Sequence, residues 1–336
     1  MVATMPALIP ERTAVTAETF RDELAPASRP VVLRGFAAHW PAVAAGRGGA
    51  IADYLKAHDR GAPVQAFVGP PEIGGKFFYA AEGRAMNFAR REGRISAIID
   101  EVLSHAGRPD APSIYVGSTP APQALPGFAE ANPNPVLGPS VVPRVWIGGE
   151  TVVATHHDLS DNIAVCVAGR RRFTLMPPEQ TRNLYVGPLD FTPAGQPVSM
   201  VDLEAPDLTR YPRFAEALET AMVAELEPGD AIYIPALWWH HVRAIGPLNV
   251  LVNYWWNEIA AVAGSPFEVL IHALMSVRHL PAPQRAAWRA VFDHYVFGDE
   301  DPGAHLPPAL KGVLGPLSPR LTRNVRAFVG HAMKGG

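Results

Sequence analysis

The chain has 336 residues, 48% of them hydrophobic and 18% charged, with a formal net charge of −3. These values indicate a folded globular protein, and they give no excess of basic charge that would favour nucleic-acid binding. No apolar run approaches the ~20 residues of a membrane span, the N-terminus lacks a secretory signal pattern, and the single cysteine excludes a disulfide framework, so we expect a cytoplasmic protein.

Residues 1–110 are expected to form an α/β segment that packs on a β-barrel and extends it. Thr16 is a suitable N-cap for a short helix over residues 17–24, because its hydroxyl can accept from amides of the first turn. The apolar run PVVLRGF, residues 30–36, predicts a buried strand. Further helices are expected over residues 51–58 and 95–105, and further strands over residues 63–68, 76–79 and 85–88.

Residues 111–258 are expected to form the barrel itself, and SIYVG, residues 113–117, predicts its first strand. Residues 118–143 are rich in Pro, Ala, Gly and Asn, and so long a loop is either an active-site cover or a surface excursion. From residue 144 to 256 short apolar runs such as TVVAT and AIYIP alternate with Gly, Pro and Asp. This texture favours an all-β barrel or sandwich.

Residues 259–336 are expected to be helical, and to contribute to dimerisation. The run SPFEVLIHALMSVRHL begins with Ser265 as N-cap, Pro266 at the first helical position and Glu268 completing a capping box. Two more helices are predicted over residues 282–296 and 319–333. The predicted fold class is therefore mainly β, with helical additions and C-terminal helices.

The stretch THHD suggests half of a metal site. Residues two apart in a strand point to the same face, so His156 and Asp158 project together while His157 projects the other way. A third ligand must come from elsewhere, and the distant run EPGDAIYIPALWWHH offers His240 and His241. Two histidines and one carboxylate form the facial triad of non-haem Fe(II) oxygenases, which leaves open positions on the metal.

Two segments, THHDLSDNIAVCVAGRRRFTLMPPEQ and EPGDAIYIPALWWHHVRAIGPLNVLVNYWW, resemble the cupin-like JmjC hydroxylases. The best-known member of that family is the asparaginyl hydroxylase that inhibits hypoxia-inducible factor. Gly229, Pro235 and His240 have the spacing of the second cupin motif, and His241 does not. The resemblance covers roughly residues 144–256. It implies a double-stranded β-helix, the jelly-roll or cupin core, with Fe(II) as cofactor and 2-oxoglutarate as co-substrate.

By position, the resemblance makes His156, Asp158 and His240 the iron ligands. The family has a lysine fifteen residues after the first histidine, which holds the distal carboxylate of 2-oxoglutarate, and Arg171 stands there in this chain. Arginine can bind a carboxylate through two parallel hydrogen bonds. Strand alternation places the neighbouring arginines on the opposite face from Arg171.

A second departure is Val153, which stands where relatives carry a threonine that helps to bind 2-oxoglutarate. Tyr115 is a candidate for the missing hydrogen-bond donor. Asn162 and Asn253 match family asparagines that line the co-substrate pocket, and their alternative is a structural role in a turn or strand.

Trp239 and Trp255 are candidates for the substrate pocket, although a tryptophan in such a chain is more often part of the core. His157 and His241 are expected to be structural or to support the ligands.

The resemblance implies an oxygenase that hydroxylates an unactivated C–H bond, and we favour a protein or peptide side chain over a small molecule as substrate. Two other interpretations stay open: a metal-dependent cupin that acts without 2-oxoglutarate as a dioxygenase or isomerase, and a non-enzymatic ligand-binding cupin. In relatives the C-terminal helices form a homodimer interface, so we expect a homodimer.

Overall fold

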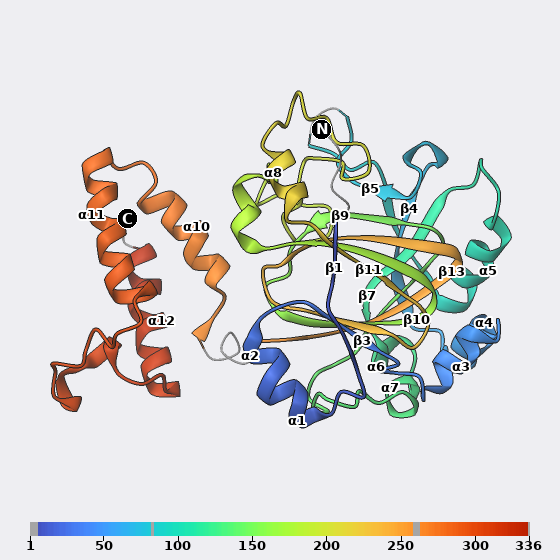
Figure 1. The fold of residues 1–336 in the computed structure, drawn as a ribbon, viewed down its shortest axis with the longest axis horizontal. Coiled ribbons are helices and arrows are strands. Elements are labelled where there is room, and N and C mark those ends of the chain that lie inside the picture. The colour runs from blue at the N-terminus through green and yellow to red at the C-terminus, as the bar shows by residue number, and fades with distance from the viewer. Residues whose placement is uncertain (1–5, 82–83, 258–262, 335–336) are drawn as a thin grey trace. The chain divides into compact units, whose positions relative to one another are not determined.

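The structure is a computed structural model that describes residues 6–81, 84–257 and 263–334 (Figure 1). The chain divides into two compact units, Met1–Trp256 and Asn257–Gly336. All strands in the described part of the chain belong to the first unit, and the second unit is helical.

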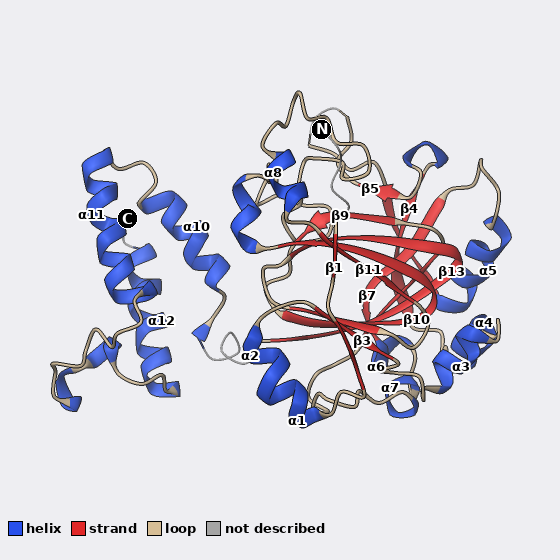
Figure 2. Ribbon diagram, in the orientation of Figure 1, coloured by secondary structure: helices blue, strands red, loops and turns tan. Residues whose placement is uncertain are grey.

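The strands of the first unit form one continuous sheet, which folds back on itself into two facing layers (Figure 2). Both layers share the two longest strands, β10 (Asp161–Met176) and β13 (Trp239–Trp256), which pair antiparallel along their length. Residues 161–168 pair with residues 250–256 in the first layer, and residues 170–176 pair with residues 239–245 in the second. The predicted jelly-roll, or cupin, core is confirmed.

A β-bulge separates the two halves of β10. The register with β13 shifts between Cys166 and Arg170, and Gly169 lies in this interval with φ +71°. A Cβ at Gly169 would meet the Oδ1 atom of Asn249 at 2.2 Å, so only glycine fits. Since bulges bend strands, this glycine lets the pair pass from one layer to the other.

The remaining strands extend each layer on both sides of the shared pair. In the first layer β12, β3 and β2 lie on one side, and β8, β7, β4 and β6 lie on the other. In the second layer β11 and β1 lie on one side, and β9 and β5 on the other. The bounds are β1 Ala7–Leu8, β2 Glu11–Thr13, β3 Val31–Arg34, β4 Pro63–Gly69, β5 Lys76–Phe77, β6 Ala89–Arg94, β7 Ser113–Pro120, β8 Arg144–Gly148, β9 Val152–His156, β11 Met222–Leu226 and β12 Ala231–Ile234.

Strand alternation separates two apolar cores. In β10 the side chains of Ile163 and Val165 pack in a core that includes residues of the helices, whereas Ala164 and Cys166 pack with residues of the second layer such as Phe173. The helical segments within residues 20–58, 95–105 and 121–131 therefore cover one face of the first layer, whereas Phe214 and Ala217, of the helix over residues 214–219, pack in a separate cluster with Met176 and Trp239. The space between the layers is left mainly to strand residues. Their bounds are α1 Ala17–Thr19, η1 Phe20–Leu24, α2 Ala25–Ala27, α3 Pro41–Arg47, α4 Ile51–His58, η2 Pro71–Ile73, α5 Ile95–His105, α6 Ala121–Ala124, α7 Phe128–Ala131, η3 Pro178–Arg182 and α8 Phe214–Glu219.

Two local expectations are corrected. The strand predicted over residues 85–88 lies instead at β6, where an exposed, arginine-rich segment pairs with β4. The position of β6 is set by its pairing with β4, and the polar side chains of β6 gave no sequence signal for a strand. Most of residues 118–143 do not cover the site, because Leu125 and Phe128 are fully buried in the helix-side core and Asn132 accepts from the Ala42 amide at 3.0 Å.

The second unit contains α10 (Pro266–Ser276), α11 (Ala282–Phe292) and α12 (Pro319–Lys334). The Ser265 Oγ atom accepts from the Phe267 amide at 3.2 Å, which confirms the predicted N-cap. Among the described residues no helix is long and apolar enough to cross a membrane. The unit also contains a π-helical segment, η4 Asp293–Phe297, and two short 3-10 helices, η5 Pro308–Leu310 and η6 Gly312–Leu314.

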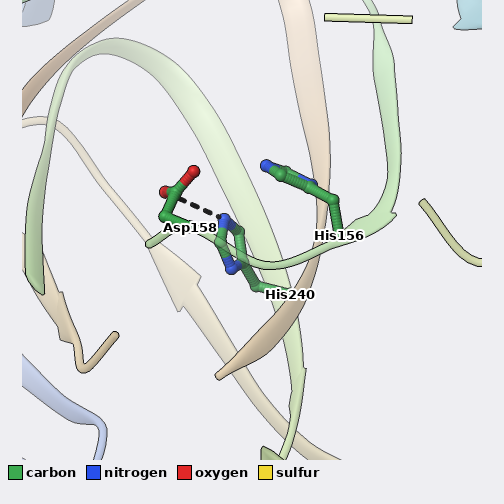
Figure 3. Close-up of side chains that lie close together, drawn as sticks. All are labelled: His156, Asp158 and His240. Carbon is green, nitrogen blue, oxygen red and sulfur yellow. Dashed lines mark ion pairs between the residues drawn. The ribbon is translucent and has the colours of Figure 1, made fainter. Parts of the chain in front are cut away.

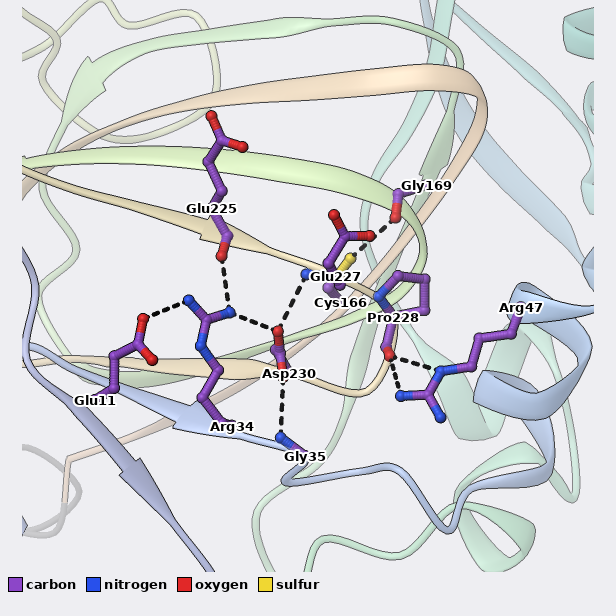
Figure 4. Close-up of polar contacts among 10 residues, drawn as sticks. All are labelled: Glu11, Arg34, Gly35, Arg47, Cys166, Gly169, Glu225, Glu227, Pro228 and Asp230. Atoms are coloured by element: carbon purple, nitrogen blue, oxygen red, sulfur yellow. Dashed lines mark hydrogen bonds and ion pairs between the residues drawn. The ribbon is translucent and has the colours of Figure 1, made fainter.

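The turn of the EPGD motif is anchored by Asp230 (Figure 4). Its carboxylate accepts from the Gly35 amide at 2.9 Å, from the Glu227 amide at 3.2 Å and from Arg34 Nη1 at 2.6 Å. Arg34 also donates to Glu11 at 2.6 Å, and the two carboxylates raise the pKa of the guanidinium. The strand that leads to the second histidine motif is thereby fixed to β2 and β3.

We predict that Asp230→Ala lowers the free energy of unfolding by about 2–3 kcal/mol, because two backbone amides and Arg34 lose their acceptor. Urea unfolding followed by circular dichroism measures the change. Asp22→Ala is the matched control, since Asp22 forms an exposed ion pair with Arg21 and its loss should leave the unfolding midpoint unchanged. Equal midpoints for Asp230→Ala and wild type would contradict the anchoring role.

Candidate metal centre

His156, Asp158 and His240 converge at one end of the space between the layers (Figure 3). His156 ends β9, Asp158 lies in the turn before β10, and His240 pairs with His156 across the β9–β13 ladder. Their ligand atoms all lie within 4.8 Å of one another, and the two imidazole centroids are 4.2 Å apart. The structure therefore brings the three predicted ligands close enough together to share one metal ion.

Hydrogen bonds orient both imidazoles for a metal. The Nδ1 atom of His156 lies 2.9 Å from the Ala154 carbonyl, and that of His240 lies 3.0 Å from the Trp238 carbonyl. A carbonyl can only accept, so each Nδ1 carries the proton and each Nε2 presents a lone pair. Burial, together with the nearby His156 ring, lowers the pKa of His240 and so favours its neutral form.

The Asp158 carboxylate is held by two donors on one of its oxygens. Oδ2 accepts from the Trp255 indole at 3.0 Å and from the Asn162 amide at 3.2 Å, and it lies 3.6 Å from Nε2 of His240. Oδ1 has no hydrogen-bond partner among the described residues. Two imidazoles and a carboxylate, with no thiolate, suit Fe(II) or Mn(II).

The adjacent histidines point away from this set. The His157 ring packs edge-on against Trp239 with centroids 4.6 Å apart, and His241 pairs with Thr174 on the strand face opposite His240. Burial lowers the pKa of both rings. Strand alternation thus decides between the two histidines of each motif.

The three residues open into a cavity of about 250 Å³ between the layers. Its walls are mainly apolar and aromatic, and Asp158 is the one acidic side chain among the described residues that line it. Besides the three residues, the lining consists of Phe77, Phe88, Tyr115, Ser118, Trp146, Val152, Val153, Ala154, Asn162, Arg171, Phe173, Pro193, Ala194, Gln196, Val198, Val242, Leu251, Asn253 and Trp255.

Arg171 reaches the cavity from the second layer. It is 5% exposed, its Nε atom has no hydrogen-bond partner, and it forms no ion pair with any described residue. Burial lowers its pKa to about 10, so the guanidinium stays charged at neutral pH. A buried cation without a counter-charge is costly, and the arrangement suits an anionic ligand. Arg170 and Arg172 are exposed, as alternation predicted.

Two asparagines and a tyrosine face the same cavity. Asn253 Nδ2 donates to Asn162 Oδ1 at 2.7 Å, and the Asn253 Oδ1 atom is buried without a hydrogen-bond partner. Tyr115 stacks between Phe67 and Trp146, with ring centroids 4.8 and 6.1 Å away. Burial raises the pKa of the Tyr115 hydroxyl, which therefore remains a donor.

The two predicted pocket tryptophans lie in different places. Trp255 lines the cavity and contacts Asp158. Trp239 is 1% exposed, packs in a separate apolar cluster with Phe214 and donates to Thr181 Oγ1 at 3.0 Å. Its place in the substrate pocket is therefore corrected, since it directly precedes His240 on β13 and must face the other way.

Several lining residues were not anticipated from the sequence. Phe77, Phe88 and the loop residues Pro193 and Gln196 come from segments without a recognisable motif. An isolated β-bridge between Val198 and His156 holds the loop of Pro193 and Gln196 near the end of β9. This contact is visible only in the folded structure, so it could not be anticipated from the sequence.

A family model described as a cupin-like domain matches residues 16–261. Curated relatives include tRNA wybutosine-synthesizing protein 5 of Danio rerio, 36% identical over 105 residues, or 31% of this chain and 29% of the relative. Lysine-specific demethylase JMJ31 of Arabidopsis thaliana is 37% identical over 114 residues, or 34% of this chain and 20% of the relative. HSPB1-associated protein 1 of Homo sapiens is 34% identical over 151 residues, or 43% of this chain and 30% of the relative. The matches thus span at most 30% of these three relatives' lengths.

We predict that Trp255→Phe weakens Mn(II) binding by about tenfold, because Asp158 loses the indole donor that orients it. Titration followed by electron paramagnetic resonance of free Mn(II) measures the affinity. Trp256→Phe is the matched control, as the Trp256 ring packs against Phe20 and Tyr233 instead. Equal affinities for Trp255→Phe and wild type would show that this hydrogen bond does not support the ligand.

Proposed function

This chain belongs to the cupin-like, JmjC-type domain family, and on that basis we propose that it is an Fe(II)- and 2-oxoglutarate-dependent oxygenase. The observation that carries the proposal is the pairing of a His-Asp-His set with an uncompensated buried guanidinium in one cavity. His156, Asp158 and His240 would hold the metal through two Nε2 atoms and one carboxylate oxygen. Three ligands on one side leave the remaining metal positions for small molecules.

Arg171 is proposed to bind the distal carboxylate of 2-oxoglutarate. A planar guanidinium offers parallel N–H groups that match the two oxygens of a carboxylate. Such an anion would neutralise Arg171, which has no carboxylate partner among the described residues. Arginine in place of the family's lysine thus retains the charge and adds directionality.

Tyr115 is proposed to supply the second donor to the co-substrate. Its hydroxyl stays protonated because burial raises its pKa, and the ring is held between two aromatic neighbours. It would replace the threonine for which Val153 stands in this chain. Asn162 and Asn253 line the same wall, where their amides would fix the orientation of the co-substrate.

When bound, Fe(II) and 2-oxoglutarate supply the oxidation of a C–H bond by O2, with succinate and CO2 as the other products. The chain itself would orient the bound groups and limit the access of water to them. Phe173, Val242 and Leu251 form an apolar wall beside the ligands and exclude water from it. His156 and His240 retain their Nδ1 protons on backbone carbonyls, so the chain's own hydrogen bonds keep both rings in the metal-binding tautomer.

We propose a protein or peptide side chain as the substrate and hydroxylation as the outcome. One relative is named as a lysine-specific demethylase, and another is named for its association with the protein HSPB1. Both names support a protein or peptide substrate. A third relative's name refers to tRNA, but a net charge of −3 provides little attraction to a polyanion. We also propose that the helices of residues 259–336 form a homodimer, because exposed apolar side chains such as Ile271 and Phe328 lie on them.

We predict that Arg171→Leu weakens 2-oxoglutarate binding by about a hundredfold, because a charged, desolvated pair is lost. Calorimetric titration of the Mn(II)-loaded protein measures the affinity, and succinate release under air with Fe(II) measures turnover. Arg171→Lys should retain part of both.

Arg172→Leu is the matched control, since Arg172 is exposed on the opposite face of the same strand. Metal binding without any 2-oxoglutarate binding by wild type would favour the metal cupin that acts without this co-substrate. Equal 2-oxoglutarate affinities for wild type and Arg171→Leu would remove the assignment of Arg171.

A further inference from the structure

Arg144 lies at the rim of the metal cavity. It is the first residue of β8, and alternation puts its side chain on the same face as Trp146, which lines the cavity. Its guanidinium carbon lies 5.9 Å from the centroid of the Trp255 ring. Because Trp255 donates to Asp158, only one side chain separates Arg144 from a proposed metal ligand.

Ser118 fixes the orientation of the Arg144 guanidinium. Nε donates to Ser118 Oγ at 2.7 Å, and Nη2 donates to the Ser118 carbonyl at 2.6 Å. These two bonds occupy one edge of the planar group. The end formed by Nη1 and the second Nη2 hydrogen has no hydrogen-bond partner in the part of the chain that the structure describes. Two parallel N–H groups at this end match a carboxylate.

The backbone around Ser118 is shaped for this contact. Ser118 adopts φ +45°, a left-handed conformation that is strained for a residue with a side chain. It lies within the register shift of β7 against β8, between Val116 and Thr119. Bulges beside active sites re-aim polar groups, and this one directs both the hydroxyl and the carbonyl of Ser118 at Arg144.

The charge of Arg144 is not compensated within the described residues. It forms no ion pair, and burial lowers its pKa, whereas the paired Arg34 is held by Glu11 and Asp230. Arg171 also has no ion pair among the described residues, and the proposed function assigns it to the distal carboxylate of 2-oxoglutarate. Arg144 is therefore free to pair with a different anion.

The position of Arg144 indicates where that anion sits. Arg144 does not line the cavity, but it adjoins the lining residues Ser118 and Trp255 and is half-buried. An anionic group bound to Arg144 would lie beside the substrate group that enters the cavity. In a peptide this is the side chain of a neighbouring residue.

Resting on the proposed function, we propose that Arg144 binds a carboxylate of the substrate, and that the enzyme thereby selects peptides with an aspartate or glutamate next to the oxidised residue. Arg144 is the residue that determines specificity, and Ser118 positions it.

The test uses pairs of short, end-blocked peptides that carry either Asp or Asn, or either Glu or Gln, beside a varied central residue. Fluorescence anisotropy measures their binding to the full-length Mn(II)-loaded protein, and succinate release measures turnover with Fe(II). Wild type should bind the acidic member of a pair about tenfold more tightly. Arg144→Gln should bind both members equally, and Arg144→Glu should prefer peptides with lysine at the same place.

Arg172→Gln, an exposed arginine elsewhere on the barrel, is the matched control and should keep the acidic preference. Equal binding of both members by wild type, or an acidic preference that survives in Arg144→Gln, would overturn the inference. Peptide-independent conversion of 2-oxoglutarate separates the two proposals. If wild type binds and converts 2-oxoglutarate but shows no acidic preference, only the role of Arg144 fails. If it does not bind 2-oxoglutarate, the proposed function fails and the inference falls with it.

Discussion

The bend in the β10–β13 pair is the constraint on which the rest of the site depends. Gly169 permits the bend in β10. The two halves of β10, before and after this glycine, contribute to facing walls of one cavity. Asn162 precedes the bend and Arg171 follows it, so residues nine positions apart look into the same space from opposite layers. β13 does the same with His240 and Asn253. A flat pair of strands could not enclose a ligand in this way.

Charge is the second organising feature of the region. The candidate metal ligands are two imidazoles and one carboxylate, and the guanidinium groups of Arg144 and Arg171 nearby have no acidic partner among the described residues. Elsewhere Arg34 and Lys76 are paired with carboxylates. An unpaired, partly buried cation is unfavourable, and its retention at two places around one cavity supports our proposal that anionic ligands bind there. The apolar walls strengthen these interactions, because they lower the local dielectric.

Strand alternation explains both what was predicted correctly and what was not. It selected His156 over His157 and placed Arg171 opposite its exposed neighbours. The same rule, applied to Trp239, would have excluded it from the pocket, because it directly precedes His240. The position of β6 and the packing of residues 118–143 lay beyond this rule, since partners distant in sequence decide which strand an edge segment joins and which face a loop covers.

The sequence by itself determined the cupin core, the three candidate ligands and the candidate co-substrate arginine. The pairing of His156 with Asp158 follows from strand alternation, which is a local property. The cupin core, His240 and Arg171 follow from the resemblance of two motifs to the cupin-like JmjC hydroxylases. Only the tertiary structure decided which groups lack a counter-charge, which aromatic rings wall the cavity and where Arg144 lies relative to Trp255. Such properties depend on the pairing of β7, β8 and β13. No pattern within one segment encodes the contacts that this pairing creates.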